Sequence, residues 1–135
     1  MNRPIDILPA TVLLVHPEPE LRGIYTRLLR AEFLTVEACA NIEELLELLH
    51  FHRPELLVIS TDAFNSRAHR LLRQVRQDHS QAVLITVGAT PGSGNNSLVA
   101  LTAFGAVSHI DPRTSRVGAI AAAARQAVMS AKYAH

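Results

Sequence analysis

The sequence is poor in residues that would point to several kinds of function. Cys39 is its one cysteine, and Lys132 is the only lysine among its 135 residues. A lone cysteine cannot form a disulfide within the chain, and its place in an alternating apolar stretch predicts a buried, unreactive thiol in a reducing compartment. The formal net charge is only +1, which gives no reason to expect a nucleic-acid or membrane surface.

Long apolar runs are missing as well. The N-terminal stretch MNRPIDILPATVLLV has one basic residue and prolines at positions 4 and 9, so it lacks the uninterrupted apolar segment of a signal peptide. No later run approaches the roughly 18 apolar residues of a membrane span. We therefore expect a cytoplasmic protein with no membrane contact. Residues 1–10 are expected to form a leader without regular structure, 11–131 one domain and 132–135 a tail.

Short apolar segments alternate with amphipathic ones along the chain. The apolar spacing predicts strands at residues 11–16, 34–39, 56–60, 82–87 and 107–110. Helices are predicted at 19–31, after Asn41, and at 65–77, 97–104 and 114–131. In the last helix the predicted buried stripe is Val117, Ile120, Ala121, Ala124 and Val128. This alternation predicts a single-domain α/β fold with a doubly wound, five-stranded parallel sheet.

Polar residues follow the apolar strands at the places where ligands gather in such folds. His16 and Pro17 come directly after the first strand, within TVLLVHPEPE at residues 11–20. Ser60 ends the third strand, and Asp62 follows it closely. Because the carboxyl ends of parallel strands meet at one edge of the sheet, these residues are predicted to lie at a shared crevice.

The order and spacing of four segments resemble the receiver domain of two-component response regulators (CheY-like), over essentially residues 11–130. The segments are LLVHPEPELR at 13–22, TVEACANIEELLELL at 35–49, RPELLVIS at 53–60 and LTAFGAVSHIDP at 101–112. The resemblance implies a flavodoxin-like sheet with strand order 2-1-3-4-5.

Receiver chemistry transfers a phosphoryl group to an aspartate, with Mg²⁺ held by an acidic pair and with a lysine and a Ser or Thr contacting the product. The resemblance places the acidic pair on His16 and Pro17 and the acceptor on Ser60. The lysine position falls on Asp111 or Pro112, and the hydroxyl position on Thr86, unless the register slides to Gly88. Proline has no side-chain donor atom, and neutral imidazole is a poor Mg²⁺ ligand. We therefore expect a degenerate pseudo-receiver without metal, cofactor or enzymatic activity.

The resemblance also implies how such a module signals. In the family, the face made by the fourth helix, fifth strand and fifth helix carries dimerisation and output. In this chain the face covers about residues 97–128 and includes Leu101, Phe104, His109 and Ile120. We expect a homodimer or a protein partner there, and no nucleic acid contacted by this domain itself.

Other interpretations of the polar residues remain open. A small-ligand, phosphate-binding or enzymatic domain would use the crevice of His16, Ser60, Asp62 and Thr86 with the glycine-rich loop at 88–97. A phospho-receiver with a displaced acidic site would use Glu18 and Asp62. A serine hydrolase is disfavoured because Ser60 has no flanking glycine. The structural alternative is that His16 and Ser60 satisfy each other as a polar pair.

Overall fold

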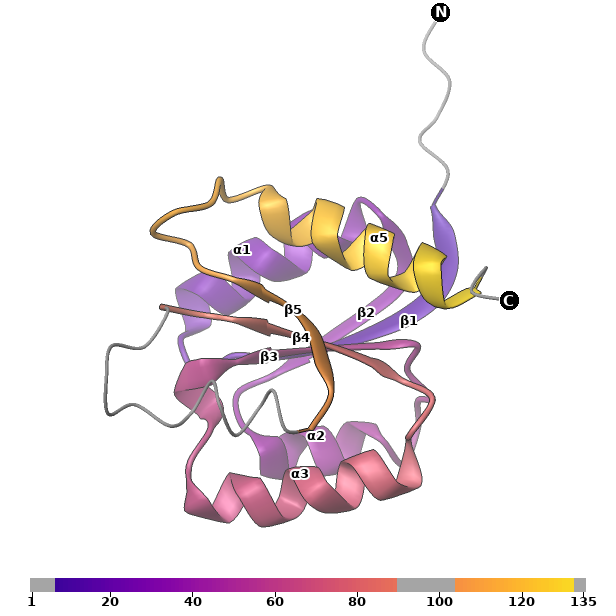
Figure 1. The fold of residues 1–135 in the computed structure, drawn as a ribbon, viewed down its shortest axis with the longest axis vertical. Helices are drawn as coiled ribbons and strands as arrows, with labels where there is room; N and C mark the ends of the chain where they lie inside the picture. Colours follow the sequence, from indigo (N-terminus) through magenta and orange to yellow (C-terminus); the bar gives the residue numbers. More distant parts are fainter. Residues whose placement is uncertain (1–6, 90–103, 133–135) are drawn as a thin grey trace, which may run out of the picture.

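A five-stranded parallel sheet forms the middle layer of the molecule (Figure 1). The structure is a computed structural model that describes residues 7–89 and 104–132. The sheet order is β2-β1-β3-β4-β5, and all paired strands are parallel, which confirms the predicted fold class and strand order. The strands are β1 (Leu8–Val15), β2 (Phe33–Cys39), β3 (Leu56–Ser60), β4 (Val83–Val87) and β5 (Ala106–Ile110).

Helices cover both faces of the sheet, with α1 and α5 on one side and α2 and α3 on the other (Figure 1). They are α1 (Pro19–Arg30), α2 (Ile42–Leu48), the short 3₁₀ helix η1 (Thr61–Ala63), α3 (Ser66–Asp78) and α5 (Ala119–Lys132). None of these described helices is long and apolar enough to span a bilayer. The two helical layers are what a right-handed β-α-β chain produces when it winds in both directions from a central strand.

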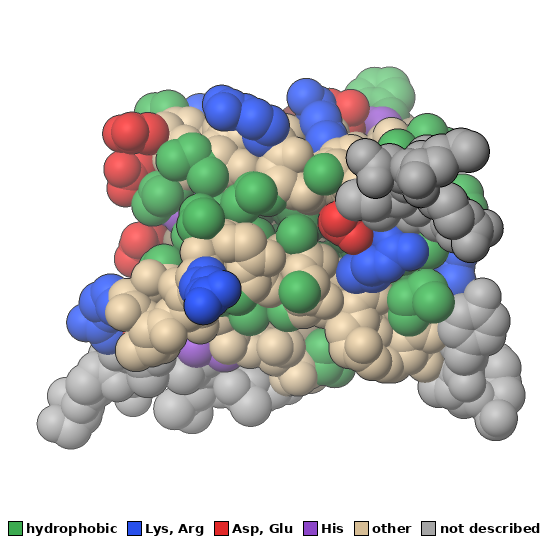
Figure 2. All heavy atoms as spheres, turned by 90° about the horizontal axis from the view of Figure 1, so that it is seen from above, with side chains coloured by type: hydrophobic (Ala, Val, Ile, Leu, Met, Phe, Trp, Pro, Cys, Tyr) green, Lys and Arg blue, Asp and Glu red, His purple; other side chains and the backbone are tan. Residues whose placement is uncertain are grey.

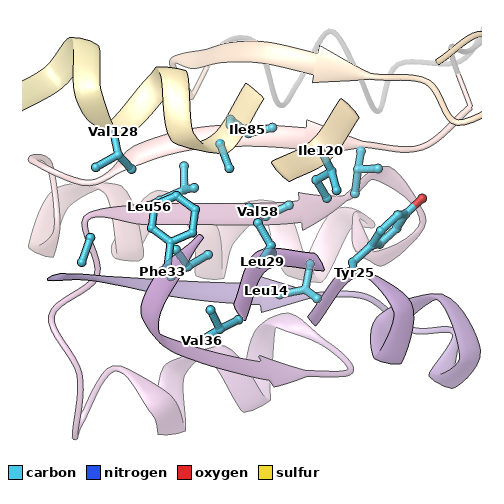
Figure 3. Packing of buried hydrophobic residues seen from close by; sticks show 14 residues of the cluster. Leu14, Tyr25, Leu29, Phe33, Val36, Leu56, Val58, Ile85, Ile120 and Val128 are labelled. Carbon is cyan, nitrogen blue, oxygen red and sulfur yellow. The ribbon is translucent and has the colours of Figure 1, made fainter. Parts of the chain in front are cut away.

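Each face of the sheet has its own hydrophobic cluster, because successive side chains of a strand point to opposite faces. Leu14, Val58 and Ile85 point toward Leu29 of α1 and Ile120 of α5 (Figure 3). Their sequence neighbours Leu13, Leu57 and Leu84 pack against α2 and α3. All five residues of β3 are buried, which explains why that strand reads as one continuous apolar run.

Cys39 is buried at the end of β2, as the sequence predicts. Its exposed fraction is 6%, and its Sγ lies 3.6 Å from the carbonyl oxygen of Leu14. Burial raises the pKa of this thiol to about 12. Because the thiolate is the reactive form, the side chain is chemically quiet at neutral pH.

Two predicted boundaries are wrong. β1 begins at Leu8, where Leu8 pairs with Phe33 ahead of a register shift, so residues 8–10 belong to the sheet and not to a leader. The last helix begins at Ala119 and not at 114, because the carbonyl of Asp111 accepts from the backbone of Thr114 and Ser115 and holds this stretch in a turn. The predicted helix at 97–104 lies outside the described residues, except for residue 104.

The later start of α5 changes which of its residues are buried. Val117 is 58% exposed, so its predicted place in the buried stripe is wrong. Ile120, Ala124 and Val128 are buried in the cluster shared with α1, as the sequence predicts. Ile120 is only 1% exposed, and this corrects its assignment to an interface, since a partner cannot reach it.

Truncation of Ile120 tests its place in the core. Ile120→Ala is expected to lower the free energy of unfolding by about 2–5 kcal/mol, the usual cost of deleting buried methyl groups and leaving a cavity. Val117 lies in the exposed segment just before the same helix, and Val117→Ala is expected to change the free energy of unfolding by about 0.5 kcal/mol or less. Urea unfolding followed by circular dichroism measures both values. Equal, small effects of the two substitutions would contradict the described packing.

Candidate functional site

The predicted site residues that follow β1 and β3 are buried at the edge where these strands end. His16 is 3% exposed and Ser60 0% exposed. The His16 ring lies on the α1 side of the sheet, with its centroid 5.7 Å from that of Tyr25. Pro17, Glu18 and Asp62 are exposed at the same edge. The structure thus brings these five residues together, as expected for the ends of neighbouring parallel strands.

His16 is bound by the backbone of its own neighbourhood. Its Nδ1 accepts a hydrogen bond from the backbone N–H of Glu18 at 3.1 Å, so Nδ1 carries no proton in this arrangement. Its carbonyl oxygen accepts from Nη1 of Arg22 at 2.9 Å. The imidazole therefore fixes the turn that leads from β1 into α1, and Nδ1 is not free to bind a metal ion.

Ser60 also bonds to the segment that follows it. Its Oγ accepts from the backbone N–H of Asp62 at 3.1 Å and so caps η1. The expectation that His16 and Ser60 satisfy each other is therefore wrong, because each accepts from the N–H two residues further along the chain. A side chain that can bond to its own turn needs no partner on a neighbouring strand.

Thr86 does not share a face with Ser60. The register pairs Ser60 with Val87 and Ile59 with Thr86, and paired residues of neighbouring strands point to the same face. Thr86 is fully buried on the opposite face, where its Oγ1 lies 2.7 Å from Nδ1 of His109. The prediction that Thr86 supplies a hydroxyl beside the acceptor position is therefore wrong.

Thr61 and Gly88 come into close contact between the ends of β3 and β4, and the sequence analysis did not single out Thr61. Gly88 has a φ of +149°, and a Cβ at this position would collide with Oγ1 of Thr61. Only glycine fits there without movement of Thr61. A glycine directly after a buried strand is the one sequence signal that could have indicated this close approach.

Asp111 occupies the position that the resemblance assigns to a lysine. It is 6% exposed, and its Oδ1 accepts from the backbone N–H of Arg113 at 2.9 Å. Its Oδ2 accepts from Nη2 of Arg113 at 3.2 Å, and this hydrogen bond raises the pKa of Arg113. The charge at this position is therefore the reverse of the expected one, and it is used to hold the turn before α5.

The two residues that the resemblance assigns to the acidic pair offer no side-chain oxygen ligand to a magnesium ion. Within residues 7–89 and 104–132, no group of three or more His, Cys, Asp or Glu side chains is placed to hold a metal. Magnesium prefers several oxygen ligands in near-octahedral geometry, whereas His16 offers an engaged nitrogen and Pro17 offers no side-chain donor.

The predicted interface residues are found in different environments. Leu101 lies outside the described residues. Phe104 packs edge-on against Phe64 and His69, with ring centroids 6.2 and 5.0 Å apart. His109 is partly buried beside Thr86, and its Nε2 has no hydrogen-bond partner within the described part of the chain.

The pH dependence of stability tests the environment of His16. Burial lowers the pKa of His16 below the ordinary 6.5, Arg22 lowers it further, and the carboxylates of Asp62 and Glu18 oppose the shift. The unfolded chain therefore binds the proton more readily than the native one, so this contribution to stability is complete above about pH 6.5 and is lost as the pH falls through the native pKa.

His16→Asn is the matched variant, because an asparagine oxygen can still accept from the N–H of Glu18. The unfolding free energy of the wild type minus that of the variant is expected to be constant above about pH 6.5 and to decrease below it. Urea titrations of both proteins across this range measure the difference, and the other titrating groups cancel. A difference that stays constant or grows on acidification would contradict the buried, neutral imidazole.

Comparison with known proteins finds similar structures but no match to a family model and no match among curated proteins. A CheY-like response regulator receiver domain from Methanospirillum hungatei aligns with a TM-score of 0.78 at 14% identity, over 94% of this chain and 99% of that one. A response regulator from Thermotoga maritima aligns with a TM-score of 0.74 at 17% identity, over 91% of this chain and all of the other.

A longer protein is similar over only part of its length. NtrX from Brucella abortus aligns with a TM-score of 0.76 at 19% identity, over 93% of this chain but 28% of that one. Identities this low are informative about the fold, and the agreement of sheet order, helix placement and coverage leaves one conclusion: this chain has the fold of response-regulator receiver domains.

Proposed function

We propose that this chain is an atypical receiver-fold signalling module of a two-component system, which acts in the cytoplasm through protein contacts and independently of phosphorylation. The observation that carries the proposal is which residues lie at the edge of the sheet where β1 and β3 end. Buried His16, exposed Pro17 and buried Ser60 lie at the positions that the resemblance assigns to the acidic pair and the acceptor aspartate.

The chemistry of these groups argues against phosphoryl transfer. A serine attacks only when a base removes its proton, and Nδ1 of His16, at the same edge of the sheet, already accepts from the backbone N–H of Glu18. The incoming phosphoryl group is anionic, and the buried carboxylate of Asp111 stands where the family has a cation. Ser60 and Asp111 thus supply neither the activated nucleophile nor the positive charge that phosphoryl transfer uses at the positions assigned to them. On these grounds we also propose that it is not an enzyme.

The contact surface that we propose lies along β5 and α5. Val107 of the edge strand β5 is 64% exposed, and a groove of about 590 Å³ runs between β5 and α5. Ala123, Ala127 and Ser130 line the groove from the helix side, and these small residues allow a partner to approach closely. Viewed onto α1 and α5, the surface shows hydrophobic side chains between scattered charged ones (Figure 2). We propose a second copy of the chain as its first occupant.

Incubation with acetyl phosphate and Mg²⁺ tests independence from phosphorylation. The intact mass of the protein is expected to stay unchanged, while a receiver domain with a complete acidic site gains a phosphoryl group under the same conditions. A gain of mass would overturn the proposal. Repeating the reaction with Asp62→Asn and Glu18→Gln would then show whether a displaced acidic site is responsible.

Sedimentation velocity over a range of concentrations tests the contact surface. The chain is expected to self-associate, and Val107→Asp is expected to weaken association by about tenfold or more, since it buries a charge at the contact. Leu34→Asp is the matched control, because Leu34 is 70% exposed on β2, the opposite edge strand. A monomer at all concentrations, or equal effects of both substitutions, would contradict the proposed surface.

A further inference from the structure

A groove between the ends of α2 and α3 has the features of a binding site that the receiver fold does not explain. It consists of two adjoining cavities of about 350 and 280 Å³, which share Leu49, His50, Asp78 and His79. Both helices reach the groove with their C-terminal ends, so it lies at the edge of the sheet opposite to the ends of β1 and β3 (Figure 1). We refer to it as the α2–α3 groove.

The inner part of the groove is lined by both apolar and polar side chains, and its rim carries groups that can bind an anion. Leu46 and Val75 line the inner cavity. The rim has three imidazoles and one guanidinium, from His50, His52, His79 and Arg53. In the part of the chain that the structure describes, these four side chains make no hydrogen bond or ion pair with the protein, so their donors are available to a ligand. Phe51, 82% exposed, adds an aromatic ring to the same rim.

Two charged side chains face the groove, one of each sign. Arg53 comes from the loop after α2 and Asp78 from the end of α3, and both oxygens of Asp78 already accept from Nε2 of Gln74 at 3.1 Å. Asp78 thus has a partner on its own helix, whereas the guanidinium of Arg53 has none among the described residues and can donate to an anion.

A metal ion fits the groove less well than an anion does. The described residues contain no group of three ligating side chains placed to coordinate a metal, although three histidines line this groove. The last carbonyls of α2, which could attract a cation, accept from the backbone N–H groups of His50, Phe51 and His52. The donors of the rim favour a negatively charged head group, and the side chains of Leu46, Leu49 and Val75 can pack against an apolar body.

We propose that the α2–α3 groove binds a small organic anion, a phosphate monoester or carboxylate with an apolar body. The head group would accept from Arg53 and from imidazole N–H groups of the rim, and the body would contact Phe51 and the side chains of Leu46 and Val75. This proposal is independent of the proposed signalling function, because no residue of the groove belongs to the β5 and α5 surface.

Titration of the full 135-residue chain with phenyl phosphate, followed by amide NMR spectra, tests the proposal. Saturable shifts are expected at residues 49–53 and 78–79. Inorganic phosphate in a parallel titration is expected to bind at least about tenfold more weakly, because it lacks the apolar body. Absence of saturable shifts with phenyl phosphate, or equal binding of both probes, would overturn the assignment.

Substitutions separate the groove from general surface charge. Arg53→Gln and the double variant His50→Gln with His79→Gln are each expected to weaken phenyl phosphate binding by about tenfold or more. Arg73→Gln, an exposed arginine on α3 outside the groove, is expected to leave it unchanged. If the double variant fails to fold, Arg53→Gln alone tests the proposal, because Arg53 is exposed and its replacement is not expected to affect folding. Equal binding by Arg53→Gln and wild type, or saturable binding of Zn²⁺ at the same amides, would show that the groove is not an anion site.

Discussion

The alternation of side chains across the sheet is the constraint on which the rest of this structure depends. Because the side chains of paired residues share a face, the register decides which groups can meet at the edge of the sheet. The pairing of Ser60 with Val87 places Ser60 on the α1 and α5 side, together with His16. The same register sends Thr86 to the other face, where His109 becomes its partner. A difference of one residue in the strand register therefore places the hydroxyl groups of Ser60 and Thr86 on opposite faces of the sheet. Replacing a single side chain does not change the register, so it cannot move them to the same face.

The polar residues at this edge are stable because their bonds are local. His16 and Ser60 each accept from an N–H two residues ahead, and Asp111 accepts from Arg113 two residues ahead. A buried polar group costs free energy only when it lacks a partner, and a partner within the same turn is available as soon as the strand ends. None of these bonds requires a metal ion or a charge on a neighbouring strand. The edge thus consists of three turns whose buried polar groups are bonded within the same turn. The packing of the two hydrophobic clusters does not depend on these bonds.

Much of the fold follows from the sequence because periodicity is a local property. The continuous apolar run of β3 and the amphipathic helices α1 and α3 predict their own environments, and together they fix the layers. The predictions are wrong where contacts with distant parts of the chain determine the boundaries of an element. β1 gains Leu8 only because Phe33 lies opposite, and α5 starts late because Asp111 closes a turn over residues that have helical spacing. The separation of Thr86 from Ser60 depends on strand register, which no single strand encodes. The site residues could therefore be named from the sequence, while their partners could not.

The replaced residues also make physical sense as a set. An acidic pair beside an acceptor aspartate places like charges at the ends of adjacent strands, and such a cluster is repulsive unless a cation is bound. His16, Pro17 and Ser60, at the positions that the resemblance assigns to these groups, carry no carboxylate, and the carboxylates of Glu18 and Asp62 at the same edge are exposed to water. The charge that remains buried, Asp111, has its own arginine. Three carboxylates form three repulsive pairs, and each carboxylate takes part in two of them, so the absence of even one relieves most of the repulsion. The turns at this edge therefore hold together without a bound cation, because their buried polar groups are bonded within the chain.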